Sequence, residues 1–135
     1  MIKILTAVNF ADVAVKSDSL FRLIRQSGDD TSPGERGLLL YKGGNVCDED
    51  FSYYSASAIC REMGYKQASH WTTVDFSPDD NYQDTRFNIT PSKVVCDNED
   101  WKSCFYSTDT IDCDPFEDVM LTCTGSCFYT STILI

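Results

Sequence analysis

The stretch N-V-C-D-E-D-F-S-Y-Y-S-A-S-A-I-C-R-E-M-G-Y, residues 45–65, carries the strongest indication of the fold. Its second half predicts a helix over residues 52–63, because four apolar side chains recur at helical spacing on one face: Ala56, Ile59, Cys60 and Met63. Gly64 follows at the point where a helix commonly ends in a left-handed residue. The same spacing turns Cys60 toward the interior.

Outward from this helix, the sequence predicts short strands and long loops. Extended segments are expected at residues 21–25, 37–42, 46–47, 94–96 and 119–123. The first two flank the turn-rich residues 27–34 and are expected to pair as a hairpin. Residues 66–92 show no sustained period, so we expect a long loop there with little regular structure.

Length and charge limit the classes of function. The chain has 135 residues, enough for one domain with a modest core, and 21 acids against 11 bases give a formal net charge of −10. So few bases argue against nucleic acid and against an anionic membrane surface as partners. Twelve of the acids lie in residues 75–118, with only three bases. This acidic region is either a solvated face or a cation site.

Seven cysteines indicate an oxidising compartment: Cys47, Cys60, Cys96, Cys104, Cys113, Cys123 and Cys127. No pair has the C-x-x-C spacing of a zinc ribbon or a thioredoxin-type site, and His70 is the one histidine. We therefore expect disulfides, with one thiol left over because the count is odd.

The order of motifs resembles the scavenger receptor cysteine-rich (SRCR) family. Cys-Asp-Glu-Asp-Phe, residues 47–51, resembles the family's motif of a cysteine followed by two acids and an aromatic. The helix ending in Cys-Arg-x-hydrophobic-Gly-Tyr, residues 60–65, resembles a second family motif. Matching cysteines follow in residues 95–96, 101–104, 112–113 and 121–123. The resemblance covers residues 20–124, leaving residues 1–19 as an N-terminal extension or weak signal-like segment and 125–135 as a C-terminal tail. It implies an α+β fold in which a small curved antiparallel sheet cradles one main helix, with long loops.

Six of the cysteines match the group A pattern of this family. The resemblance implies the pairs Cys47–Cys113, Cys60–Cys123 and Cys96–Cys104, which leaves Cys127 as an unpaired thiol. The sequence alone allows many other pairings.

A calcium site also follows from the resemblance. Metal-binding members use the two acids after the first cysteine and a late glutamate, which correspond to Asp48, Glu49 and Glu117. Joining Cys47 to Cys113 would bring these carboxylates near one another, and hard oxygen ligands suit Ca²⁺. The alternative is an exposed acidic rim without metal.

Catalysis has little support, because His70 stands alone in the expected loop without a flanking nucleophile motif. We expect no enzyme activity. Asn88-Ile89-Thr90 is a glycosylation sequon, although Pro91 follows it directly. The uncharged residues 119–135 fall short of the roughly 20 apolar residues of a membrane span.

The resemblance implies an extracellular ligand-binding module of scavenger-receptor type, which recognises polyanionic, microbial or protein ligands with the assistance of Ca²⁺, as in innate immunity. The net charge of −10 would repel a polyanion unless Ca²⁺ bridges to it. The alternative is a structural or protein-interaction accessory domain, without metal, of a larger mosaic extracellular protein.

Overall fold

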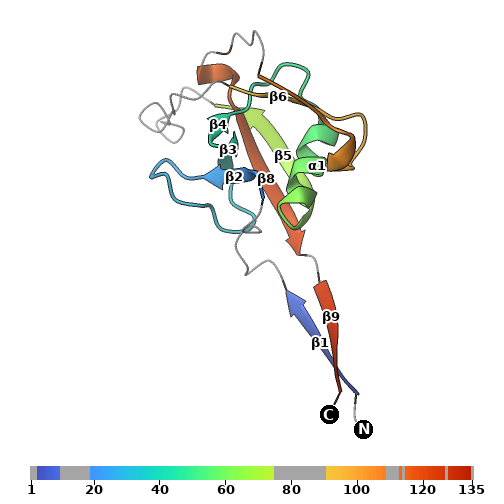
Figure 1. Ribbon diagram of the computed structural model, residues 1–135. Helices are drawn as coiled ribbons and strands as arrows, with labels where there is room; N and C mark the ends of the chain where they lie inside the picture. The colour runs from blue at the N-terminus through green and yellow to red at the C-terminus, as the bar shows by residue number, and fades with distance from the viewer. Residues whose placement is uncertain are drawn as a thin grey trace.

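The computed structural model describes residues 3–9, 19–74, 91–108, 113, 115–126 and 128–134. Within them, one α-helix lies against an antiparallel sheet (Figure 1), so the expected α+β fold is confirmed. The sheet order is β2 (Phe21–Ile24), β3 (Gly37–Tyr41), β8 (Val119–Ser126) and β5 (Tyr65–Thr73), and β4 (Gly44–Asn45) pairs with β3.

Two smaller ladders accompany the main sheet. β6 (Lys93–Val95) pairs with β7 (Phe105–Ser107), and short 3₁₀ turns lie at η4 (Trp101–Ser103) and η5 (Pro115–Glu117). β1 (Lys3–Asn9) pairs antiparallel with β9 (Phe128–Leu134), with Lys3 opposite Leu134. Figure 1 shows this two-stranded ladder projecting from the body, with both chain ends at its outer end.

The helix α1 (Tyr53–Glu62) forms where the apolar spacing predicts it. Ser52 caps its start, because the Ser52 hydroxyl accepts a hydrogen bond from the backbone N–H of Ser55 at 3.3 Å. Gly64 ends it with φ +100°. The predicted inward face is buried, and Cys60 forms a disulfide with Cys123 of β8. The helix is therefore joined covalently to the sheet that it covers.

The sheet has two buried faces, which explains why β3 is buried at every residue. On β8, Val119, Leu121 and Cys123 face the cluster beneath α1, whereas Met120 faces a second cluster. The members of the second cluster are Ile24, Leu38, Leu40, Val74 and Met120. A large apolar side chain that is fully buried contributes about 1.5–3 kcal/mol to stability. The sheet is thus the centre of the core.

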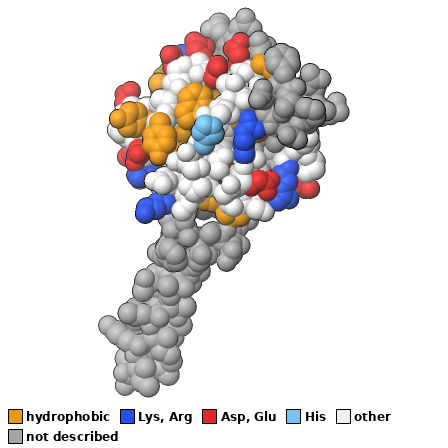
Figure 2. Space-filling model, turned by 180° about the vertical axis from the view of Figure 1, so that it is seen from behind, with side chains coloured by type: hydrophobic (Ala, Val, Ile, Leu, Met, Phe, Trp, Pro, Cys, Tyr) orange, Lys and Arg blue, Asp and Glu red, His pale blue; other side chains and the backbone are white. Residues whose placement is uncertain are grey.

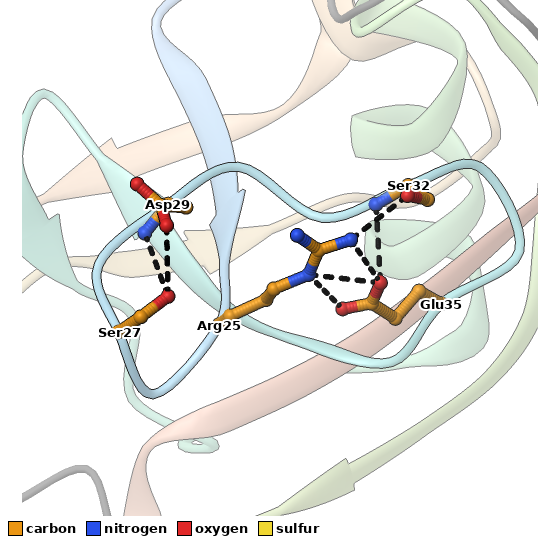
Figure 3. Close-up of polar contacts among 5 residues, drawn as sticks. All are labelled: Arg25, Ser27, Asp29, Ser32 and Glu35. Atoms are coloured by element: carbon orange, nitrogen blue, oxygen red, sulfur yellow. Dashed lines mark hydrogen bonds and ion pairs between the residues drawn. The ribbon is translucent and has the colours of Figure 1, made fainter.

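The predicted hairpin of β2 and β3 is confirmed, and an ion pair closes its loop (Figure 3). Arg25 Nε lies 2.7 Å from Glu35 Oε2, and Arg25 Nη2 lies 2.8 Å from Glu35 Oε1. The same guanidinium donates to the Ser32 hydroxyl at 2.9 Å. This two-pronged contact joins the two ends of the loop, and both of its partners belong to the hairpin itself.

The strand β5 shows that the prediction of a long loop over residues 66–92 was wrong for the first part of that range. Tyr65–Thr73 is a nine-residue strand that pairs with β8. Tyr65 and Ala68 are buried with two exposed residues between them, and the register shifts between Ala68 and His70. A bulge of this kind abolishes strict alternation, which hid the strand from the pattern. Residues 75–90 lie outside the described residues.

Candidate functional site

The candidate site lies where three segments meet beside the first of the six paired cysteines. The backbone N–H of Cys47 donates to the carbonyl of Ser92 at 2.9 Å. One residue along, the N–H of Asp48 donates to the carbonyl of Glu117 at 2.8 Å. Three stretches far apart in the sequence are therefore fixed side by side by their backbones.

Three disulfides hold the described residues together, and they are the pairs that the resemblance implies. Cys47–Cys113 joins Cα atoms 5.9 Å apart, Cys60–Cys123 joins them at 5.4 Å, and Cys96–Cys104 at 4.2 Å. The first of these anchors the segment that carries the acids Asp48, Glu49 and Asp50.

The acids after Cys47 form a tight turn, which we call the acidic turn (residues 48–51). The N–H of Phe51 donates to the carbonyl of Asp48 at 3.0 Å, and Asp50 has φ +56° in the left-handed region. Phe51 is buried, whereas the side chains of Glu49 and Asp50 are 55% and 64% exposed. The turn therefore points two carboxylates outward while Phe51 fixes its end in the core.

A lysine from β6 pairs with two of the three acids of this turn, which keeps a net negative charge. Lys93 Nζ lies 2.8 Å from Asp50 Oδ2 and 3.4 Å from Glu49 Oε1. The Lys93 side chain is 23% exposed, less than either acid. The hydrogen bond with Asp50 is the main cause that raises the pKa of Lys93 above its ordinary value, and Glu49 adds to it.

A buried polar pair lies behind the acidic turn. Asn45 Nδ2 donates to Asp118 Oδ2 at 2.7 Å, and the two residues are 1% and 3% exposed. The backbone of Asp118 forms a bridge with Cys47. Removing the carboxylate would leave the Asn45 amide without this charged partner in a place that water does not reach.

The three expected calcium ligands are only partly brought together. Asp48 and Glu117 are neighbours through their backbones, but the carboxylate of Glu49 is directed to Lys93. Among the described residues, no group of three His, Cys, Asp or Glu side chains is placed to hold a metal ion. The arrangement around Lys93 therefore does not fit a site of three carboxylates, and Ca²⁺ binding stays a prediction.

Two expected features lie outside the described residues: the glycosylation sequon at Asn88 and the unpaired thiol of Cys127. We expected His70 in a loop. It lies instead on the strand β5, opposite Thr122, with its side chain exposed.

The sequence did not indicate a small apolar pocket at the end of β2. Its lining consists of Leu20, Phe21, Tyr41, Glu62, Trp101 and Tyr106. The Tyr41 and Tyr106 rings stack with centroids 5.0 Å apart, and burial raises the pKa of Tyr106 to about 12. Lys102 Nζ lies 6.0 Å from the centre of the Trp101 ring. These residues are scattered along the chain, so no local motif marks them.

The surface mixes acidic and apolar side chains. In the view of Figure 2, several acidic side chains gather at the upper edge of the body, and hydrophobic ones lie beside the histidine. The large hydrophobic residues with the most exposed surface include Tyr53 at 47%, Tyr54 at 52% and Phe105 at 66%. Within the described residues, no helix has the length and apolar character needed to cross a bilayer.

Comparisons with known proteins agree with the cysteine pattern. The chain matches the model of the scavenger receptor cysteine-rich domain over residues 29–124. It is 33% identical over 106 residues to lysyl oxidase homolog 2 of Xenopus laevis, which covers 74% of this chain and 13% of that protein. Lysyl oxidase homolog 2B of Danio rerio is 32% identical over 106 residues, with the same 74% and 13% coverage.

A third relative, lysyl oxidase homolog 2 of Bos taurus, is 29% identical over 115 residues, covering 81% of this chain and 14% of that protein. The chain thus spans a small part of the length of the curated relatives that it matches. The match to the family model extends over most of the chain and includes all six paired cysteines. The chain therefore belongs to the scavenger receptor cysteine-rich domain family.

Proposed function

We propose that this domain is an extracellular, non-catalytic protein-interaction module, and that its partner presents a basic protein surface. The observation that carries this proposal is the acidic turn, where the Cys47–Cys113 disulfide and Phe51 hold Glu49 and Asp50 outward. Carboxylates fixed in this way attract a partner of opposite charge without losing much conformational entropy on binding.

The net charge supports a basic partner over the polyanions expected from the resemblance. With a formal charge of −10, the domain repels anionic polymers at long range and attracts cationic surfaces. Two exposed tyrosines, Tyr53 and Tyr54, lie in the first turn of α1, after Ser52, which follows the acidic turn. Tyrosine is enriched at protein interfaces, so the neighbouring surface suits a protein more than a polysaccharide.

The length comparison supports an accessory role in a larger protein. Because the chain matches 13% of the Xenopus laevis relative, the domain corresponds to one module among others in that protein. We propose the same arrangement here, with the domain supplying contacts while any catalysis belongs to other parts of the polypeptide. Three disulfides among the described residues are consistent with an extracellular location.

The test measures binding of a fluorescent lysine-rich peptide, with heparin as the polyanion for comparison. We expect the peptide to bind, and its affinity to fall as NaCl is raised. The double variant Glu49→Gln/Asp50→Asn should weaken this binding about tenfold.

The matched control is Asp29→Asn/Asp30→Asn, which removes the same charge from the exposed loop between β2 and β3. It should weaken binding far less. Equal losses in the two double variants, or tighter binding of heparin than of the peptide, would contradict the proposal.

A calcium-assisted version is the second candidate, and the contact between the backbones of Asp48 and Glu117 favours it. In this version Asp48, Glu49 and Glu117 would hold Ca²⁺, which would bridge to an anionic ligand. Calorimetric titration of Ca²⁺ into the wild type and Glu117→Ala decides between the two. Heat in the wild type that disappears in the variant supports the calcium version, and no heat in the wild type removes it.

A further inference from the structure

We infer that Lys93 is a built-in counter-ion of the acidic turn, and that its ammonium group takes the place a divalent cation would have between Glu49 and Asp50. The inference concerns how the charge of this turn is balanced, and its test measures Ca²⁺ binding and stability without any protein partner.

The position of Lys93 is fixed by the backbone before its side chain is considered. Ser92, the residue before it, donates its N–H to the carbonyl of Asn45 at 2.8 Å and accepts from Cys47 at 2.9 Å. On its other side, Lys93 belongs to β6 and pairs with Ser107 of β7. Backbone hydrogen bonds before Lys93 and strand pairing at Lys93 itself therefore fix its backbone beside the acidic turn. Its ammonium group reaches the carboxylates with little loss of conformational entropy.

The local charge favours a cation at this place. Asp48, Glu49 and Asp50 are consecutive, and like charges at this range repel one another unless a cation lies among them. Lys93 Nζ contacts two of the three carboxylates, at 2.8 and 3.4 Å. The other ion pairs found in the described residues join different acids, namely Arg22 to Asp30, Arg25 to Glu35 and Arg61 to Glu99.

A lysine suits this role because its ammonium is a compact point charge with three donors. It satisfies carboxylate oxygens from one side, as a small cation does. When the charge at position 93 is removed, the carboxylates of Glu49 and Asp50 lose the cation that they share, and their oxygens are of the kind that a hard divalent cation prefers. The turn should then respond to Ca²⁺ more strongly than it does in the wild type.

The experiment compares the whole chain with its disulfides intact, as wild type and as Lys93→Gln, Lys93→Glu and Lys93→Arg. Calorimetry measures Ca²⁺ binding directly, and the midpoint of thermal unfolding is measured with CaCl₂ and with NaCl at equal ionic strength. The charge-matched control is Lys102→Gln, which removes a lysine that lies by Trp101.

We expect Lys93→Gln to bind Ca²⁺ at least about tenfold more tightly than the wild type, and its unfolding midpoint to rise with CaCl₂ but not with NaCl. Lys93→Glu should respond more strongly because it adds a carboxylate. Lys93→Arg and Lys102→Gln should behave as the wild type does. An equal response of the wild type and Lys93→Gln to Ca²⁺, including no response in either, overturns the inference.

A fifth variant covers the case in which Lys93→Gln folds poorly. Lys93→Gln/Asp50→Asn removes one charge of each sign, so it should fold without Ca²⁺ and lose the response to it. A double variant that folds no better than Lys93→Gln would show that Lys93 acts through packing, and would overturn the inference as well.

Discussion

Two loops of this domain are closed by a cation and a carboxylate, but they are built in different ways. In the loop between β2 and β3, Arg25 and Glu35 lie ten positions apart in one hairpin and meet in a two-pronged contact. In the acidic turn, the cation comes from Lys93 on a separate ladder, 44 positions away from Glu49. The first ion pair is local in sequence and uses a two-pronged guanidinium. The second joins distant residues and uses the single charge of an ammonium group.

The difference teaches what each pair can do. A guanidinium fork fixes the orientation of the carboxylate as well as its distance, so Arg25 shapes its loop. An ammonium group neutralises charge with little directional demand, so another cation can replace it. The acidic turn therefore depends on elements that bring Lys93 near, whereas the β2–β3 loop depends on its own residues.

The largest expected change in stability comes from removing the disulfide that anchors the acidic turn. Cys47→Ala/Cys113→Ala removes a disulfide that closes a sequence separation of 66 residues, and should lower the free energy of unfolding by about 2–5 kcal/mol. Removing Cys96–Cys104, which spans 8 residues, should lower it less. Urea unfolding followed by circular dichroism measures both. A larger loss from the shorter bridge would show that chain entropy does not dominate.

A smaller loss of stability is expected when the buried polar pair behind the acidic turn is broken. Asp118→Ala removes the buried carboxylate that accepts from Asn45, and should destabilise the domain by about 1.5–3 kcal/mol. Asp118→Asn keeps an acceptor and should lose less. Asp97→Ala, at an exposed position, is the control and should change stability little. A loss for Asp97→Ala as large as that for Asp118→Ala would contradict this explanation.

Exchanging the two basic residues sharpens the comparison between fork and point charge. Arg25→Lys should lower the unfolding midpoint by roughly 1–3 °C, because an ammonium cannot reproduce the paired contacts to Glu35. Lys93→Arg should lower it less, since charge is what the acidic turn requires. Differential scanning calorimetry of both variants tests this order, and the reverse order would remove the distinction drawn between the loops.

The smallest expected effects are on the pH dependence of stability. The β2–β3 loop should lose stability at acidic pH, and the acidic turn should lose it at alkaline pH. Arg25 lowers the pKa of Glu35 below its ordinary value of 4.5, chiefly by hydrogen bonding. The stability that Glu35 contributes is therefore present above pH 4.5 and lost as the pH falls below it. Asp50 raises the pKa of Lys93 above 10.5, so that contribution is present below pH 10.5 and lost above it.

Unfolding midpoints of the wild type, Glu35→Gln and Lys93→Gln across pH measure these contributions. The gap between wild type and Glu35→Gln should close in acid, and the gap between wild type and Lys93→Gln should close in alkali. A gap for Glu35→Gln that stays constant down to about pH 2 would show that the carboxylate charge is not what holds the loop.

The parts of the fold that sequence reasoning predicted have local causes. The helix follows from four apolar residues at fixed spacing, and the Gly64 stop from a backbone angle that glycine adopts readily. β5 was missed because its bulge between Ala68 and His70 breaks the period of two. Met120 alternates with the core residues Val119 and Leu121 of its strand, and it is buried as well because the sheet has a second apolar face.

The candidate site was predicted in part. The disulfide between Cys47 and Cys113 and the nearness of Asp48 to Glu117 follow from the family pattern. The role of Lys93 could not be predicted, because it arises from a bridge between Val46 and Ser92 that no local motif encodes. A signal was present, since Lys93 is one of three bases in the acidic residues 75–118.

The pairing of β1 with β9 has a mechanical consequence. Its hydrogen bonds lie across the strands, and the outer ends of both strands lie together (Figure 1), so tension on those ends would open the ladder one residue pair at a time. Beyond the ladder, the load would pass through Cys60–Cys123, and the 63 positions between these cysteines would carry none of it through this route. The β1–β9 ladder would therefore open first, and the residues between Cys60 and Cys123 would stay unloaded.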